Sequence, residues 1–120
     1  MNFLIQRILS FKYAFRGIAT VFRTQPNMWI HLLATTVVFT AAIYFKIKWF
    51  ELAILTVTIS TVWIAEFLNT AIEFVVDLAS PEHHELAGKA KDVASGAVLV
   101  AAFFSVLIAF LIFAKYFFLR

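Results

Sequence analysis

The chain has 120 residues, of which 63% are hydrophobic and 14% are charged, and its formal net charge is +3. Soluble domains are about 45–50% apolar and about 25% charged, and a chain of this length cannot bury so much apolar surface by itself. The composition excludes a soluble globular domain and predicts an integral membrane protein with one domain, residues 1–120. The small positive charge fits interfacial anchors rather than nucleic-acid binding, and the absence of cysteine excludes a thiolate metal site or a thiol nucleophile.

Residues 1–25 are predicted to form an amphipathic helix on the membrane surface. Large apolar residues recur there at spacings of three and four, within an arc of about 80° at 100° per residue. They are Leu4, Ile8, Phe11, Phe15, Ile18 and Phe22. Lys12, Arg16 and Arg23 lie on one flank of this stripe. We expect the stripe to enter the acyl boundary and the basic flank to meet lipid phosphates; packing on the rest of the domain is an alternative that can hold at the same time.

Three apolar segments, residues 28–45, 50–76 and 90–116, are predicted to be transmembrane helices. The first reaches about 27 Å as a helix, which is just enough to span the hydrocarbon. His31 lies near one end of it, where a structural interfacial role and a functional contact are both open. The second segment is too long for a simple span, so its last turns should reach the interface. Ser80 and Pro81 are predicted to be the N-cap and first residue of the last helix. The fold class is therefore all-α, with a surface helix and three transmembrane helices.

The distribution of Lys and Arg predicts the orientation. The side of the N-terminus and of the loop near residue 84 carries Arg7, Lys12, Arg16, Arg23, Lys89 and Lys91. The other side carries Lys46, Lys48, Lys115 and Arg120. Because positive residues accumulate on the cytoplasmic side, the N-terminus is expected to face the cytoplasm.

The segment AEFLNTAIEFVVD, residues 65–77, carries the chemistry. Glu66, Asn69, Glu73 and Asp77 share an arc of about 80° on a helical wheel, so one polar stripe runs from membrane depth to the surface. Ionisable residues inside a membrane are functional candidates by default. Asp77 ends the stripe at the interface.

Lys91 and Asp92 open the uncharged run of the last helix and can face this stripe. An interhelical hydrogen-bond seam is one interpretation. A site for a divalent cation and phosphate is another, because carboxylates bind Mg²⁺ and lysine offsets phosphate charge. With only Gly17, Gly88 and Gly96, the chain cannot build a Walker A or protein-kinase glycine-rich loop. The residues alone indicate a metal, proton or cation site at the cytoplasmic end.

At this point the sequence resembles a known family, the prokaryotic diacylglycerol kinases, which include undecaprenol kinases. The strongest match is EFLNTAIEFVVD at residues 66–77. It extends to SPEHHEL at 80–86, AKDVASGAV at 90–98, FKYAFRGI at 11–18 and NMWIHLL at 27–33. The form of residues 13–17 and the hairpin at 80–83 look closer to the undecaprenol kinases.

The resemblance implies a homotrimer in the bacterial inner membrane that transfers the γ-phosphate of ATP, with Mg²⁺, to a lipid hydroxyl at the cytoplasmic interface. The acceptor would be diacylglycerol or undecaprenol, and each site would be shared between subunits. Glu66 is then the general base, and Glu66, Asn69 and Asp77 contact the lipid. Asn69 positions the substrate or the base.

The resemblance also implies a nucleotide site and a metal site. The residues expected at the nucleotide are Glu73, Lys91, Asp92, Tyr13, Arg16 and His84. Glu73 would bind Mg²⁺. The family commonly has a second metal-binding glutamate before the first span, and this chain has Gln25 there. An amide oxygen can still coordinate Mg²⁺, without the negative charge.

Two functions of other classes compete with a lipid kinase. A small ion-coupled transporter would use Glu66 and Glu73 to bind a cation or proton. A structural membrane subunit would use the polar stripe only for packing.

Overall fold

The computed structural model describes residues 2–118, which form four helices and no strand. They are α1 (Phe3–Thr24), α2 (Pro26–Phe45), α3 (Trp49–Ala79) and α4 (Glu85–Phe118). By length and composition, α2, α3 and α4 can each cross a membrane. The predicted all-α membrane fold is confirmed. Three residues lie outside the described part of the chain: Met1, Leu119 and Arg120. Met1 belongs to the predicted surface segment, and Arg120 was one of the residues used to predict the orientation.

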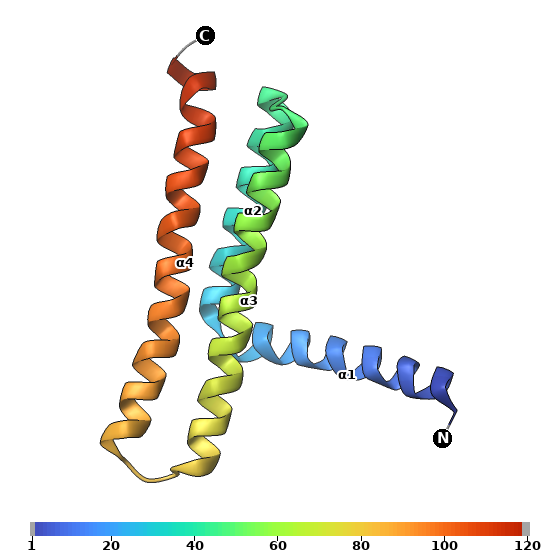
Figure 1. The fold of residues 1–120 in the computed structure, drawn as a ribbon, viewed down its shortest axis with the longest axis vertical. Helices are drawn as coiled ribbons and strands as arrows, with labels where there is room; N and C mark the ends of the chain where they lie inside the picture. Colours follow the sequence, from blue (N-terminus) through green and yellow to red (C-terminus); the bar gives the residue numbers. More distant parts are fainter. Residues whose placement is uncertain (1, 119–120) are drawn as a thin grey trace.

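The three long helices lie beside one another, and α1 projects from them at a steep angle (Figure 1). The most extensive helix contact is between the antiparallel helices α3 and α4. With 31 and 34 residues, these helices reach about 46 and 51 Å, which exceeds the hydrocarbon thickness of about 30 Å. Both helices are therefore longer than the hydrocarbon is thick. Figure 1 shows that both continue past the level of α1 to the loop that joins them.

Helix α1 is attached to the bundle by its last turn. Val21 is buried, and Phe22 makes edge-on ring contacts with Trp29 and Trp63, at 5.2 and 5.9 Å between centroids. The indole N–H of Trp29 also donates to the carbonyl of Phe22 over 2.9 Å. The rest of the predicted stripe is exposed, including Phe11 and Phe15. The last turn therefore packs on the domain, as the alternative interpretation has it. The other turns leave their apolar side chains exposed, which a helix on the membrane surface requires, and their insertion into lipid stays a prediction.

The turn between α3 and α4 differs from the prediction. Ser80 is not the N-cap of α4; it caps the end of α3, and its N–H donates to the carbonyl of Val76 over 2.8 Å. The reason is Pro81, which disfavours helical backbone at the residue before it and so ends α3. Helix α4 begins at Glu85 rather than at residue 90, and the Nδ1 atom of His84 accepts the N–H of Leu86 over 3.1 Å, as an N-cap does.

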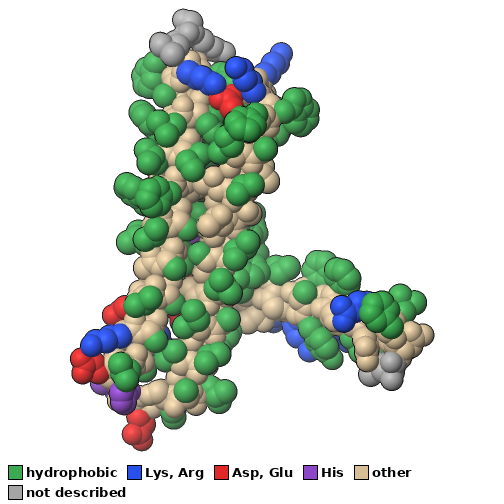
Figure 2. Space-filling view, viewed as in Figure 1, with side chains coloured by type: hydrophobic (Ala, Val, Ile, Leu, Met, Phe, Trp, Pro, Cys, Tyr) green, Lys and Arg blue, Asp and Glu red, His purple; other side chains and the backbone are tan. Residues whose placement is uncertain are grey.

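At the opposite end of the bundle, Glu51 joins the start of α3 to the end of α4. The carboxylate is buried, pairs with Lys115, and accepts the hydroxyl of Tyr116 over 2.5 Å. It also accepts the backbone N–H of Lys48 over 3.1 Å, which caps α3. Figure 2 shows this charged group at one end of the molecule and the second group of charges at the other, with an apolar surface between them.

We predict that Glu51→Ala lowers the free energy of unfolding by about 1 to 3 kcal/mol, because it leaves polar partners unsatisfied at a buried position. Thermal unfolding in detergent measures this. The control is Glu85→Ala, since Glu85 is also a first-turn glutamate paired with a lysine but is exposed, and no change is expected there. Equal effects of the two substitutions would show that Glu51 does not hold α3 to α4.

Candidate functional site

Glu66 and Glu73 of the predicted polar stripe face α2 and the α1–α2 corner, whereas Asp77 at its end faces α4. Among residues 2–118, four polar residues are buried, and all belong to α3. One is Glu51 at the far end. The other three, Glu66, Asn69 and Thr70, lie together within the predicted motif. Because buried polar groups require partners, their contacts describe what this face does.

Glu66 is the deepest ionisable group of the stripe. Only 1% of its surface is exposed, and its Oε2 atom lies 3.1 Å from Nε2 of His31 on α2. The hydroxyl of Thr70 donates to the backbone carbonyl of Glu66 over 2.9 Å. The sequence left the role of His31 open, and the structure places it against the predicted base.

Glu73 lies about 10 Å further along α3, at the corner between α1 and α2. Its Oε2 atom accepts Nε2–H of Gln25 over 2.9 Å, and its Oε1 atom accepts Nδ2–H of Asn69 over 3.3 Å. The Oδ1 atom of Asn69 is buried and has no hydrogen-bond partner in the described part of the chain. An acceptor of this kind is costly unless a ligand completes it.

These contacts belong to one antiparallel register between α2 and α3. Gln25 pairs with Glu73, His31 pairs with Glu66, and Thr35 accepts the indole N–H of Trp63 over 3.0 Å. As the residue number rises along α2 it falls along α3, so the three pairs lie at successive depths. The register puts the predicted base at membrane depth and Glu73 at the corner.

The groups around Glu73 are of the kind that bind a hard divalent cation, but both amides turn their N–H groups toward the carboxylate, so their oxygens would have to rotate toward a cation. Oxygen atoms of carboxylates and amides are the ligands that Mg²⁺ prefers, and Glu73, Asn69 and Gln25 bring one carboxylate and two amides together. The unpartnered Oδ1 atom of Asn69 is one such oxygen. Among the residues that the structure describes, no cluster of three or more His, Cys, Asp or Glu side chains has metal-binding geometry. Any cation here would therefore rely on amide oxygens beside Glu73.

Lys91 pairs with Asp77 across α3 and α4, with Nζ and Oδ1 2.5 Å apart. Both side chains are substantially exposed, at 41% and 61%, so the pair contributes little to stability. Asp92 is exposed next to Lys91. Lys91 thus faces the polar stripe, as the sequence analysis allowed, and the stripe residue with which it pairs is Asp77. The exposed pair leaves Lys91 where a ligand can displace the contact.

Within one chain, the structure does not bring the other predicted nucleotide residues, Tyr13, Arg16 and His84, to Glu73 or to the Lys91–Asp77 pair. Tyr13 and Arg16 lie on the projecting part of α1, where the guanidinium of Arg16 stacks over the Tyr13 ring at 5.5 Å. His84 caps α4 in the exposed loop. In one copy of the chain, Figure 1 shows α1 leading away from the α3–α4 loop.

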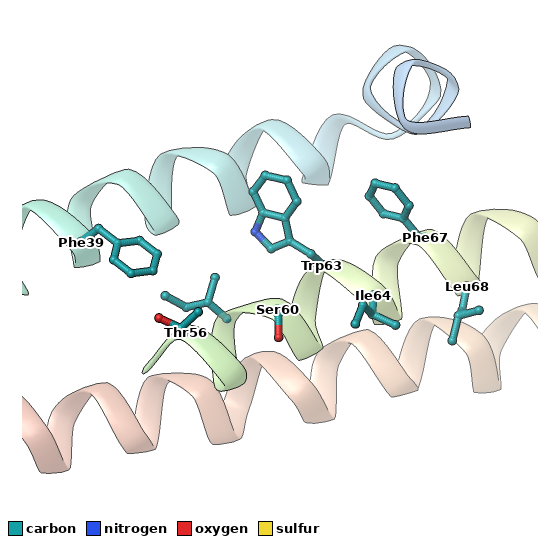
Figure 3. Close-up of a pocket in the computed structure, with 8 residues that line it drawn as sticks. Phe39, Thr56, Ser60, Trp63, Ile64, Phe67 and Leu68 are labelled. Atoms are coloured by element: carbon teal, nitrogen blue, oxygen red, sulfur yellow. The ribbon is translucent and has the colours of Figure 1, made fainter. Parts of the chain in front are cut away.

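An apolar groove of about 560 Å³ lies along α2 and α3 beside the stripe. Figure 3 shows Phe39 reaching from α2 toward α3, and Trp63 and Phe67 standing on the side of α3 nearest α2 and α1. Glu66 lies directly before Phe67 in the sequence and one helical turn after Trp63. Glu66 is not among the residues that line the groove, although Trp63, one helical turn before it, is.

The helical bundle and this stripe define an integral membrane protein with a polar site at one end. A family model described as prokaryotic diacylglycerol kinase matches residues 12–113. A diacylglycerol kinase of Synechocystis is 44% identical over 102 residues, which are 84% of this chain and 58% of that relative. An undecaprenol kinase of Bacillus subtilis is 41% identical over 104 residues, 87% of this chain and 85% of that relative.

A diacylglycerol kinase of Escherichia coli K12 is 32% identical over 95 residues, which are 79% of this chain and 78% of that relative. The chain therefore belongs to the prokaryotic diacylglycerol kinase family, a family of membrane lipid kinases. The family predicted from the motifs is confirmed. The chain spans less than two thirds of the length of the Synechocystis relative.

We predict that Asn69→Leu changes the free energy of unfolding by less than about 1 kcal/mol, because removal of a buried acceptor without a partner among the described residues offsets the lost donation from Nδ2–H to Glu73. Thermal unfolding without ligand measures this. Asn27→Leu, at an exposed position, is the control and should change stability by less than about 0.5 kcal/mol. A loss of more than about 1 kcal/mol in Asn69→Leu alone would show that the amide is a structural partner rather than a ligand group.

Proposed function

We propose that the protein transfers the γ-phosphate of ATP to the hydroxyl of a membrane lipid, either diacylglycerol or undecaprenol. The observation that carries this proposal is the separation of two carboxylates on one face of α3. Glu66 is buried one helical turn from Trp63, which lines an apolar groove, and Glu73 lies at the corner among amide groups. A lipid hydroxyl and a water-soluble triphosphate need such a pair of environments.

Phosphoryl transfer depends more on positioning and charge neutralisation than on covalent chemistry by the protein. In the proposed reaction Glu66 accepts the proton of the lipid hydroxyl as the oxygen–phosphorus bond forms. The bond from the γ-phosphorus to the bridging oxygen of ATP breaks, and ADP leaves. Asn69 lies between Glu66 and Glu73 on α3 and would hold the substrate or the base in place. General-base catalysis contributes about 10²- to 10⁴-fold to such a rate.

Glu73, with amide oxygens of Asn69 and Gln25, would hold Mg²⁺. When bound, Mg²⁺ supplies charge neutralisation at the phosphate oxygens. Lys91 would leave Asp77 and bind the phosphates of the nucleotide, because the Lys91–Asp77 ion pair is exposed and contributes little to stability. Asp92, on the same turn of α4, is proposed as a second nucleotide contact, and Asp77 as a contact near the lipid headgroup.

The acyl or prenyl chain of the lipid is proposed to lie in the groove beside Trp63 and Phe67. Its lining is almost entirely apolar, which suits a hydrocarbon chain. The exposed apolar stripe of α1 would border the entrance from the membrane surface. A lipid seated there presents its headgroup hydroxyl near Glu66.

We also propose that the site faces the cytoplasm of a bacterial inner membrane and that three copies assemble. Lys89 and Lys91 lie at the site end of the bundle, which supports the cytoplasmic orientation. A second groove, of about 810 Å³ between α3 and α4, is lined by small residues that allow another helix to approach closely; among them are Ala65, Gly96, Ala97 and Ala101. In a trimer, Tyr13, Arg16 and His84 would be able to reach a neighbouring copy's nucleotide. The family membership does not favour the ion-coupled transporter.

We predict that the purified protein in lipid transfers label from ATP to diacylglycerol or undecaprenol when Mg²⁺ is present. Glu66→Gln should reduce turnover by about 10²- to 10⁴-fold while the oligomer stays intact, because the amide cannot accept the proton. Each acceptor is tested alone. Thin-layer separation of the labelled lipid measures turnover, and native mass spectrometry measures the number of copies.

The control for this experiment is Glu82→Gln, in the exposed α3–α4 loop, which should keep wild-type turnover. No labelled lipid with either acceptor would rule out the kinase. Turnover near wild type in Glu66→Gln would remove the base assignment, and a species other than the trimer would remove the proposed assembly.

We further predict that Gln25→Glu lowers the Mg²⁺ concentration for half-maximal activity by roughly tenfold, because a second carboxylate beside Glu73 favours cation binding. Without Mg²⁺ the two like charges should lower the melting temperature, and Mg²⁺ alone should restore it. Gln6→Glu, an exposed change on α1, is the matched control. Unchanged Mg²⁺ dependence in both readouts would exclude Gln25 from the metal site.

A further inference from the structure

The Glu66 side chain has a partner for which the proposed reaction does not yet account. Its Oε2 atom lies 3.1 Å from Nε2 of His31, which comes from the second turn of α2. Only 16% of the His31 side chain and 1% of that of Glu66 are exposed. The contact joins two helices at the depth proposed for the reaction.

The chemistry of the two groups fixes the direction of this hydrogen bond. A base must be ionised, and an ionised carboxylate only accepts hydrogen bonds, so Nε2 of His31 carries the proton and donates it. A buried carboxylate is unfavourable without such a donor. An imidazole that carries its proton on Nε2 supplies that donor.

The turn that carries His31 is itself held against α3. Thr35, one turn further along α2, donates its hydroxyl to the carbonyl of His31 over 2.6 Å. The same hydroxyl oxygen accepts the indole N–H of Trp63 over 3.0 Å. These contacts tie the turn that carries His31 to α3 and so set the height of His31 relative to Glu66.

We propose that His31 is a positioning residue for the base. Its Nε2–H engages Oε2 of Glu66 and fixes the carboxylate plane, which leaves Oε1 to take the proton from the lipid hydroxyl. The oxygen–phosphorus bond forms as that proton moves, and ADP leaves with the electrons of the bond that breaks. This inference rests on the proposed function, because it assigns a partner to the proposed base.

The test compares wild type, His31→Leu and His31→Gln in the lipid kinase assay, with Glu66→Gln as the inactive reference. His31→Leu should lower kcat by about ten- to a hundredfold, since it removes a hydrogen bond to a charged group. The KM for ATP should stay unchanged, because the nucleotide groups lie at the corner and not at His31. His31→Gln should restore much of the lost kcat, since its amide nitrogen can donate at a similar reach.

The matched control is His83→Leu, at an exposed histidine of the α3–α4 loop, which should leave kcat and KM unchanged. If His31→Leu keeps the wild-type kcat, or if a folded His31→Gln is as slow as His31→Leu, the inference is wrong. If His31→Leu does not fold, His31→Gln decides alone: kcat within about tenfold of wild type supports the proposal, and the rate of Glu66→Gln overturns it. Wild-type protein that phosphorylates neither lipid overturns the proposed function, whereas an active Glu66→Gln removes only Glu66 as the base. Either result also overturns the role of His31.

Discussion

The antiparallel register between α2 and α3 is the constraint on which the rest of the site depends. Three polar pairs, Gln25 with Glu73, His31 with Glu66 and Thr35 with Trp63, cross between the helices at successive depths. Hydrocarbon offers no alternative hydrogen-bonding partners, so the pairs favour this register. One carboxylate is therefore held at membrane depth and another at the surface corner, on the same face of one helix.

The two ends of the bundle use charge differently. At the far end, Glu51 has partners on α3 and α4, and the result is a satisfied buried group that holds the helices together. At the site end, Asn69 keeps a buried oxygen that has no partner among residues 2–118, and the Lys91–Asp77 pair is exposed. Proteins commonly accept such local costs where a ligand completes the arrangement. The contrast supports a binding role for the stripe over a packing role.

Much of this architecture could be predicted from the sequence, because helical periodicity and hydropathy are properties of single segments. Helical periodicity placed Glu66, Asn69 and Glu73 on one face of a helix. The length of the second apolar segment indicated that its last turns reach beyond the hydrocarbon. Pairing between helices is different, since it depends on the register and crossing of two segments. The contact of His31 with Glu66 therefore stayed open, and the stripe residue with which Lys91 pairs, Asp77, was not singled out. Ser80 was placed on the wrong helix because Ser-Pro fits both an N-cap and a helix end, and only the path of the turn decides between them.

The most direct test of the account is an experimental structure of the protein with Mn²⁺ and a non-hydrolysable ATP analogue, with the metal located by its anomalous scattering. The α2–α3 register predicts a metal peak at Glu73, within coordination distance of the side-chain oxygen of Asn69 or Gln25, and none at Glu66, which stays on His31. A metal bound to Glu66, or one away from the α1–α2 corner, would contradict the division of roles between the two carboxylates.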